Sequence, residues 1–495
     1  MPDVSSIPNQ TDPLDAAAGS TAAAQDPHHA HRVQRSRRLK LSIASSLLIK
    51  PLAFFIPIIT IPLLIKYLGS EQRYGLYETV GAVAMWVSMV NVGMNLGLIN
   101  KLTECDVAGD RERARLYVST LSWAMLALLV VVVAAWTVVN VSVDWARAFK
   151  LTEPAARAEA SWSVWVAVAL TLLGLVATIP AAVYAGYQEI HRFNLWDGAM
   201  KLSLLAGVIV LVFTPGLAGL GVVGVLLAVS GTAALVRIVN IVTLFGFEKP
   251  WLRPSPRLFD FATLKVMLLH GVNLFVLQMA VLALFQTDKL IIGARIGAEE
   301  VAGYSILARL FLSGYGVFAL ILSPLWPAYG EAVRRGDLPW VRRQVARTRV
   351  YGAGAMLLCG VGMLVAGDWV IRVLSPGTTI TVSKNLVVAV AAMFMVRAWV
   401  ESQSIVLNAA NVFVPQMLFF GSHAALNIGL AIVLAKPFGV EGVAWSATIT
   451  GLLTSVWGYP WMIRKYILNA PPPPAPPPAE PRPGGFEPVI ATKRS

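Results

Sequence analysis

Long apolar blocks separated by short polar connectors dominate the chain. A helix that crosses about 30 Å of hydrocarbon needs roughly 20 mostly apolar residues. Twelve blocks meet this criterion when proline and glycine mark their ends. They cover residues 42–66, 75–100, 117–141, 161–184, 202–219, 220–245, 264–292, 300–327, 349–367, 386–410, 413–435 and 439–462. The sequence therefore predicts an all-α polytopic membrane protein with about 12 transmembrane helices.

The composition supports a membrane protein. Charged residues make up 14% of the chain, whereas soluble domains carry about 25%. A net charge of +13 would favour nucleic acid as the partner of a soluble chain, but here the basic residues lie in short runs between apolar blocks. We therefore expect membrane lipid and no nucleic acid as a partner. The sequence shows no metal-ligand cluster or nucleotide-binding glycine motif, so we expect no metal and no cofactor.

Lysine and arginine collect on alternate connectors. Counted along twelve spans, 26 lie on the side of the amino terminus and nine on the other side. Basic connectors stay in the cytoplasm, so both termini are predicted to be cytoplasmic. The polar segment 1–39 and the proline-rich segment 466–495 are expected to be disordered cytoplasmic tails.

Two short patterns occur twice. Residues 68–75 recur at 296–303, an offset of 228, and residues 221–225 recur at 439–443, an offset of 218. Each copy falls at the same place in a set of six blocks. The repeats predict an N-lobe of helices 1–6 (40–250) and a C-lobe of helices 7–12 (251–465). With six helices each, both lobes start in the cytoplasm, so pseudo-twofold symmetry about an axis along the membrane normal is expected.

These motifs resemble the polysaccharide-export, or O-antigen flippase, branch of the multidrug/oligosaccharidyl-lipid/polysaccharide flippase superfamily. The resemblance rests on Leu68, Gly69, Ser70, Glu71, Tyr74 and Gly75, on residues 91–97, on residues 286–289 with Gly297 and Tyr304, and on residues 439–443. It covers about residues 42–462. In one departure, Asn91 stands where the pattern carries an acidic residue.

The resemblance implies a transporter and not an enzyme. Its substrate would be an undecaprenyl-diphosphate-linked oligosaccharide, moved across the bacterial inner membrane for exopolysaccharide or O-antigen synthesis. Alternating access through a cationic central cavity is the expected mechanism. Either H⁺ or Na⁺ as a coupling ion, or consumption of the product by a polysaccharide polymerase and export machinery, would give transport its direction.

Apart from residues within two positions of a span boundary, five basic residues fall inside the predicted spans: Lys50, Arg237, Lys289, Arg309 and Arg397. Each costs about 2.5–3.5 kcal/mol at the bilayer centre unless it is paired, hydrated or able to reach the interface. Arg237 and Lys289 lie near helix ends, where snorkelling satisfies them. Arg309 and Arg397 lie about ten residues into their helices and are the strongest candidates to bind phosphate.

Other polar residues complete the candidate substrate-binding set. Glu401 follows Arg397 by one helical turn and is either its structural ion partner or part of a gate. Asp288 and Lys289 either form an ion pair at the outer mouth or simply mark the end of helix seven, and the family resemblance favours the pair. Glu78 is expected to be interfacial. The neutral candidates for a sugar-lined path are Asn91, Asn95 and Gln278, and Lys50 precedes Pro51 on a helix expected to bend.

Three other functions remain open from the sequence. A drug or cation antiporter of the same superfamily would need a net acidic site, whereas the deep candidates here are mainly basic. A membrane-embedded glycosyltransferase or polymerase would need catalytic carboxylates or a metal on a sizeable outer loop, and the longest outer connectors, 142–160 and 368–385, are short. A scaffold for an envelope complex would tolerate charge reversal at Arg309 or Arg397.

Overall fold

The computed structural model describes residues 45, 49, 51–88, 94–322 and 324–469, with side chains left out at position 96 and at several positions between 270 and 285. Lys50 and Asn91 lie outside the described residues. Gln278 belongs to a described helix, but its side chain is among those left out.

The first half contains six apolar helical stretches, several of them interrupted. They are formed by α3 (Leu52–Leu68), α4 (Glu71–Ser88) with α5 (Met94–Ala108), α6 (Arg111–Ser142), α8 (Pro154–Val176) with α9 (Ile179–Gly186), α10 (Ile190–Phe213), and α11 (Gly221–Leu226) continued by η3 (Leu227–Gly231), α12 (Thr232–Thr243) and η4 (Leu244–Glu248). Short connectors are α7 (Trp145–Ala148), η2 (Pro215–Leu220), η5 (Pro250–Leu252) and η6 (Pro256–Leu258).

The second half repeats this plan with longer helices. It contains α13 (Phe261–Arg295), α14 (Ala298–Leu322), α15 (Leu325–Arg335), α16 (Leu338–Leu374), α17 (Lys384–Ala409), α18 (Val414–Leu453), α19 (Ser455–Ile463) and η7 (Arg464–Leu468). The backbone is non-helical at Gly439 inside α18, which therefore holds the eleventh span and starts the twelfth. In the described residues, eight stretches are long and apolar enough to cross a membrane, and the one over Val414–Leu468 includes both of these spans. The predicted all-α fold with two six-helix halves is confirmed.

Polar side chains cap helices just outside the apolar blocks. Asp110, Asp260, Asp337 and Ser383 precede α6, α13, α16 and α17, and each accepts a hydrogen bond from a backbone N–H in the first turn, over 2.7–3.1 Å. Such caps satisfy donors that have no partner inside the helix. The helices therefore begin several residues before the apolar blocks that predicted them.

The repeated glycines adopt the same backbone conformation in both halves. Gly221 has φ 55° and ψ −139°, and Gly439 has φ 61° and ψ −143°. A side chain is disfavoured at this φ. At Gly221 a Cβ atom would also lie 2.2 Å from a carboxylate oxygen of Glu159. The internal sequence repeat is therefore also a repeat of local structure.

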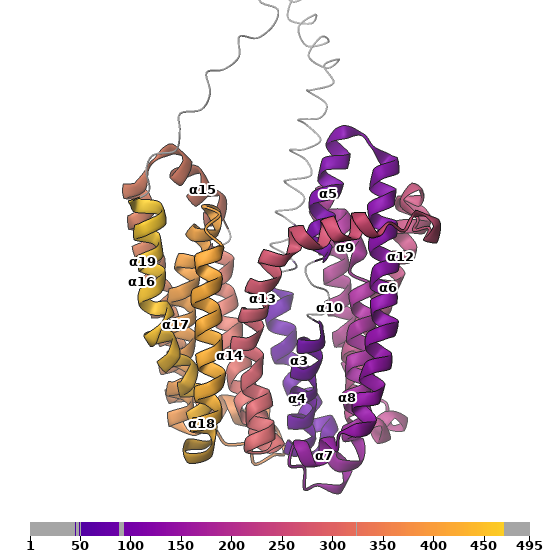
Figure 1. Cartoon of the computed structure of the whole chain (residues 1–495). Helices are drawn as coiled ribbons and strands as arrows, with labels where there is room; N and C mark the ends of the chain where they lie inside the picture. Colours follow the sequence, from indigo (N-terminus) through magenta and orange to yellow (C-terminus); the bar gives the residue numbers. More distant parts are fainter. Residues whose placement is uncertain (1–44, 46–48, 50, 89–93, 323, 470–495) are drawn as a thin grey trace, which may run out of the picture.

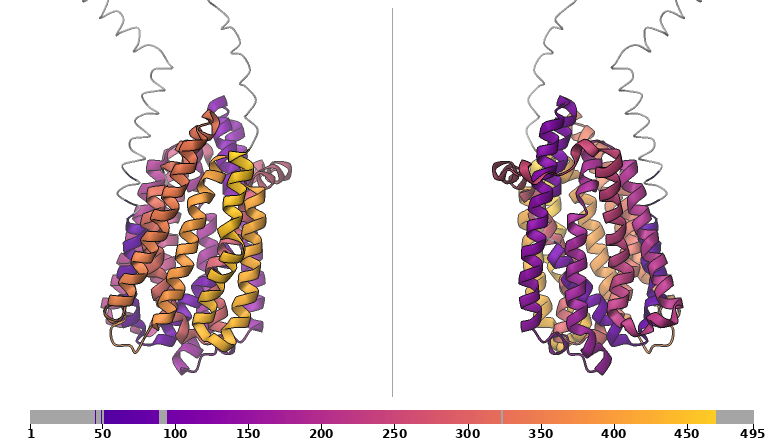
Figure 2. Two further views of the ribbon diagram at one scale, coloured as in Figure 1. Left: turned by 90° about the vertical axis from the view of Figure 1, so that its left-hand side faces the viewer. Right: turned by 90° about the vertical axis from the view of Figure 1, so that its right-hand side faces the viewer.

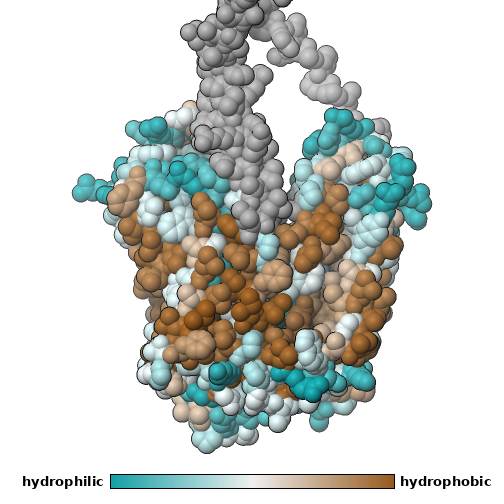
Figure 3. Space-filling view, turned by 180° about the vertical axis from the view of Figure 1, so that it is seen from behind, coloured by the Kyte–Doolittle hydropathy of each residue, from teal (hydrophilic) through white to brown (hydrophobic). Residues whose placement is uncertain are grey.

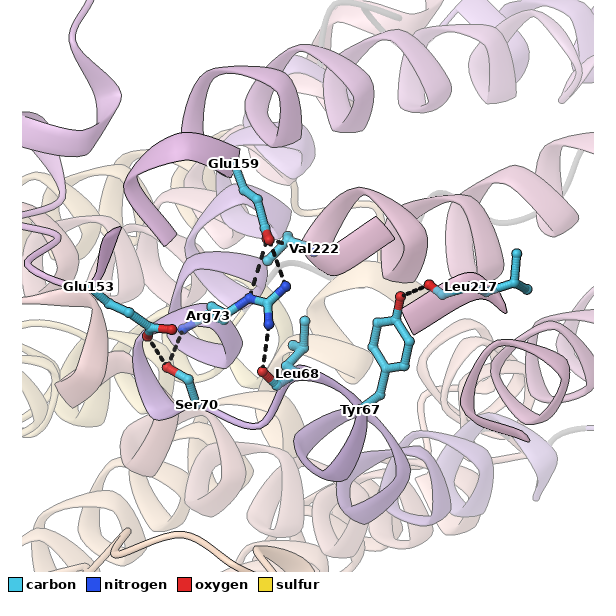
Figure 4. A network of polar contacts seen from close by, with 8 residues as sticks. All are labelled: Tyr67, Leu68, Ser70, Arg73, Glu153, Glu159, Leu217 and Val222. Atoms are coloured by element: carbon cyan, nitrogen blue, oxygen red, sulfur yellow. Dashed lines mark hydrogen bonds and ion pairs between the residues drawn. The ribbon is translucent and has the colours of Figure 1, made fainter. Parts of the chain in front are cut away.

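Polar contacts join α3, α4, α8, η2 and α11 at one end of the first half (Figure 4). Arg73 pairs with Glu159 over 2.6 Å, and the second carboxylate oxygen of Glu159 accepts a hydrogen bond from Val222 N over 2.9 Å. Tyr67 donates to the carbonyl oxygen of Leu217 over 2.6 Å. These contacts hold the start of α11 against α4 and α8, which fixes the end of the first half.

The two halves converge at the end marked by α7 and diverge toward the end marked by α15 (Figure 1). Long helices of each half run side by side between these ends (Figure 2). We call them the α7 end and the α15 end. Buried side chains of both halves share one apolar core near the α7 end, where Ala298, Ala302 and Ile306 of α14 join Leu64 and Leu76 of the first half. The halves therefore share a core at the α7 end.

A belt of apolar side chains lies between two polar zones on the face shown in Figure 3. Large apolar side chains are exposed on the outer helices, including Val130 and Val131 on α6 and Leu358 and Val365 on α16. Such exposure is unfavourable in water and favourable in lipid. The chain is therefore a multi-pass membrane protein.

Candidate functional site

A buried cluster of three charges connects the two halves. Glu78 of α4 accepts a hydrogen bond from Lys289 of α13 over 2.6 Å at Oε2, and it pairs with Arg309 of α14 through Oε1. The side chain of Glu78 is 3% exposed, whereas those of Lys289 and Arg309 are 17% and 21% exposed. The cluster has a net charge of +1, and its two cations are partly exposed.

Aromatic hydroxyl groups surround this charge cluster. Tyr74 OH donates to Glu78 Oε1 over 3.2 Å, and the rings of Tyr74 and Tyr77 lie 6.2 Å apart on the same helix. Both cations of the cluster come from the second half, whereas the carboxylate and the tyrosines come from the first. Movement of α4 away from α13 and α14 would therefore break both ion pairs together.

Contacts that lie nearer to the α7 end than the charge cluster, up to about two helical turns away along α4, also join the halves. Glu71 accepts hydrogen bonds from the backbone N–H and the hydroxyl of Thr379 over 2.7 and 2.8 Å. The backbones of α4 and α14 approach so closely that a Cβ atom on Gly75 would lie 1.6 Å from the carbonyl oxygen of Ala298. This end is closed by direct backbone packing, which only glycine permits at position 75.

Asp288 does not pair with Lys289, contrary to the expectation from sequence. Neighbouring residues on a helix point about 100° apart, and Lys289 reaches Glu78 across the interface. Asp288, 1% exposed, instead accepts a hydrogen bond from Tyr304 over 2.8 Å. The buried amide of Asn427 lies beside the same carboxyl.

Arg397 and Glu401 lie on one face of α17, as their spacing predicts, and both interact with Tyr315 of α14. The guanidinium carbon of Arg397 is 4.3 Å from the ring centroid of Tyr315 and 5.7 Å from that of Phe394. Glu401 lies within electrostatic reach of Arg397 and of the Tyr315 hydroxyl. Arg397 is thus held against aromatic faces inside the second half, apart from the cluster around Glu78.

Asn95 makes a contact within the first half. Its amide nitrogen donates to the Thr178 hydroxyl over 2.7 Å and so ties α5 to the start of α9. Arg237, expected to snorkel, donates to the carbonyl oxygen of Gly174 over 3.3 Å. Neither residue belongs to the charge cluster between the halves.

Glu78 belongs to the charge cluster, but the candidate set from the sequence did not include it. Its position near the start of an apolar block suggested an interfacial side chain, but it is buried between two cations. Charge balance could have indicated it. Lys289 and Arg309 fall in consecutive predicted helices, and Glu78 is an acidic residue at a similar depth from the outer ends of the predicted helices.

Comparison with known proteins identifies the family. Residues 39–333 match the family model described as "Polysaccharide biosynthesis protein". The chain belongs to this family. The resemblance found in the sequence motifs is therefore confirmed. This member of the polysaccharide biosynthesis family is 20% identical over 433 residues to a "Putative O-antigen transporter" of Salmonella typhi, a match that covers 87% of this chain and 96% of the relative.

Solved structures share the fold of this polysaccharide biosynthesis family member. An inward-facing multidrug resistance MATE family transporter of the MOP superfamily has a TM-score of 0.71 at 13% identity, covering 85% of this chain and 96% of that one. The lipid II flippase MurJ in an inward closed conformation has a TM-score of 0.63 at 12% identity, covering 86% and 87%. These matches show a common helical architecture.

Proposed function

We propose that this protein flips lipid-linked oligosaccharides across the bacterial inner membrane by alternating access. The substrate class is an oligosaccharide joined through a diphosphate to a long prenyl chain, as in undecaprenyl-diphosphate-linked repeat units. Its glycan and diphosphate would pass between the halves while the prenyl chain stays in lipid. No covalent step is required. Membership of the family and the similarity to an O-antigen transporter support this substrate class.

The observation that carries the mechanism is the shared anion of the charge cluster. Glu78 pairs with Lys289 and Arg309 at the same time, so both cations have this carboxylate as a partner only while the halves are together. A diphosphate carries more negative charge than one carboxylate and accepts hydrogen bonds from guanidinium and ammonium groups. A substrate diphosphate that replaces Glu78 would therefore release α4 from α13 and α14. Substrate binding and opening of the α7 end would then be coupled.

The described conformation corresponds to the state closed at the α7 end. Both halves share a core there. Toward the α15 end Tyr184 and Tyr329 belong to different cores, and the start of α13 crosses to the first half, where Met267 packs in the core of Tyr184. The predicted distribution of basic residues places the α15 end and both termini in the cytoplasm. In this orientation the substrate enters from the cytoplasmic side, and rocking of the halves exposes it to the periplasm.

Asp288 is our candidate for ion coupling. Its carboxyl is buried beside Tyr304 and Asn427, while the neighbouring Lys289 is turned toward Glu78. A carboxyl without an adjacent cation is suited to carry H⁺ or to bind Na⁺. Binding or release of that ion would change the packing of α13 against α18. If Asp288→Asn leaves reorientation fully responsive to the ion gradient, direction must instead come from consumption of the product by a polymerase.

Reorientation of lipid-linked oligosaccharide in proteoliposomes tests the proposal. Arg309→Gln and Lys289→Gln each leave Glu78 with one cation, so the fold should persist while binding of the diphosphate weakens. Loss of one charge-assisted contact predicts a rate reduction of about tenfold or more. Arg147→Gln, which removes an exposed cation from α7, is the matched control and should retain the native rate. Native rates in Arg309→Gln, Lys289→Gln and Arg397→Gln would refute the cationic path, and a drug or cation antiporter would then be favoured.

A further inference from the structure

A second basic site lies at the α15 end of the second half, away from the charge cluster between the halves. It is a cavity of about 810 Å³ between the start of α16, the last two turns of α17 and the segment of α19 and η7. Cavities of about 300–1,000 Å³ are typical of ligand sites. Four of its lining residues are arginines and none is acidic: Arg342, Arg343, Arg349 and Arg464.

The arginines of this cavity differ in how they are held. Arg349 is fixed, because its guanidinium lies 4.9 Å from the ring centroid of Trp399 and its Nε donates to the carbonyl oxygen of Val345 over 3.4 Å. Arg342, Arg343 and Arg464 are exposed, and in the part of the chain that the structure describes they form no ion pair. Several cations that converge without an internal anion attract an anionic ligand.

One buried atom indicates what else the ligand carries. Gln403 lines the cavity and is 0% exposed. Its Nε2 donates to the carbonyl oxygen of Trp399 over 3.0 Å, but among the described residues its Oε1 has no hydrogen-bond partner. A buried acceptor without a donor is unfavourable by about 1–3 kcal/mol. A ligand that combines phosphate oxygens with a hydroxyl group would satisfy both the arginines and Gln403.

The surroundings place the cavity at the level of a membrane surface. Trp457, Trp461 and Tyr466 are exposed on α19 and η7, and the ammonium of Lys465 lies 4.8 Å from the ring centroid of Trp461. Exposed aromatic residues beside cations are typical of the boundary between hydrocarbon and water. The cavity walls also include apolar side chains such as Leu468. A lipid head group can therefore enter from the adjacent leaflet.

We propose that this cavity binds the head group of an anionic glycerophospholipid. Its phosphate contacts Arg342, Arg343 and Arg464, and a head-group hydroxyl donates to Gln403 Oε1. Basic pockets between transmembrane helices are known to hold such head groups. Because the site involves α16, α17 and α19 and no residue of the first half, it anchors the second half to one leaflet. This role is separate from substrate transport and does not depend on the proposed function.

Binding of phosphatidylglycerol to the full-length protein in detergent, measured by native mass spectrometry, tests the site. Phosphatidylcholine and inorganic phosphate are the comparison ligands. Phosphatidylglycerol should bind about tenfold or more tightly than phosphatidylcholine, and Arg342→Gln with Arg464→Gln should remove most of this preference. The matched control is Arg334→Gln with Arg347→Gln, which removes two exposed cations near the same end that do not line the cavity. The control should change the affinity by less than about twofold.

Gln403→Leu separates the hydroxyl contact from the charge. Leucine has a side chain of similar size but no acceptor. The substitution should therefore weaken the binding of phosphatidylglycerol and leave the weak binding of phosphatidylcholine unchanged. An equal loss in the control pair, or no preference for the anionic lipid in the native protein, would overturn the proposal. Inorganic phosphate that competes at the same concentration as the lipid would also overturn it, since the site would then bind free phosphate.

Discussion

Replacing Glu78 with glutamine should shift the protein toward a state open at the α7 end. In the described conformation both carboxylate oxygens are occupied, by Lys289 and by Arg309, and the group is 3% exposed. Removal of one member of a buried ion pair costs about 3–5 kcal/mol, because it leaves buried charge without a partner. The side chains of Lys289 and Arg309 are 17% and 21% exposed. Because they are partly hydrated, we expect a cost near the lower end of this range, about 3 kcal/mol.

That cost applies only to the closed state. When the halves separate, Lys289 and Arg309 are hydrated, and the missing carboxylate no longer matters. A loss of about 3 kcal/mol therefore changes the equilibrium between closed and open states by about 100-fold, since about 1.4 kcal/mol corresponds to a factor of ten. A protein that is mainly closed at the α7 end should become a mixture of both states or mainly open.

Double electron–electron resonance spectroscopy, with one spin label on each half, measures this shift. Spin labels at Arg147 on α7 and at Lys384, the first residue of α17, both exposed, report the separation in a background that lacks Cys105 and Cys359. Glu78→Gln should add or strengthen a longer distance. Glu331→Gln is the control, because Glu331 is 57% exposed in its pair with Arg335 and such pairs contribute about 0–1 kcal/mol. Native distances in Glu78→Gln, or equal shifts in both variants, would refute the reasoning.

Two glycine substitutions test the packing at the α7 end. Gly75→Ala places a methyl group 1.6 Å from the Ala298 carbonyl oxygen, so it should force α4 and α14 apart and lengthen the same spin-label distance. Gly221→Ala combines φ 55° with a clash at Glu159 and should lower the thermal unfolding midpoint in detergent, with a cost of about 1 kcal/mol or more. Gly216→Ala, whose Cβ meets nothing within 4 Å, is the control for both, and an equal effect there would contradict them.

The helices were predictable because membrane spans are set by length and apolar composition, which are local properties. The pairing of Glu78 with Lys289 and Arg309 was not, because it joins residues 211 and 231 positions apart and depends on how the halves pack. Adjacent residues also point in different directions, so sequence alone could not tell that Asp288 and Lys289 face separate partners. The sequence repeat at Gly221 and Gly439 did predict a structural repeat, because a backbone with positive φ favours glycine at both positions.

Helix α13 is anchored at both ends in different halves. Met267, near its start, is buried in the core of the first half, whereas Ile291 and Ile292 are buried in the core of the second. Any rotation of one half against the other must therefore be absorbed as curvature along the stretch between these anchors. In the proposed alternating-access cycle this helix would therefore bend, and its bending stiffness would contribute to the energy barrier between the two states.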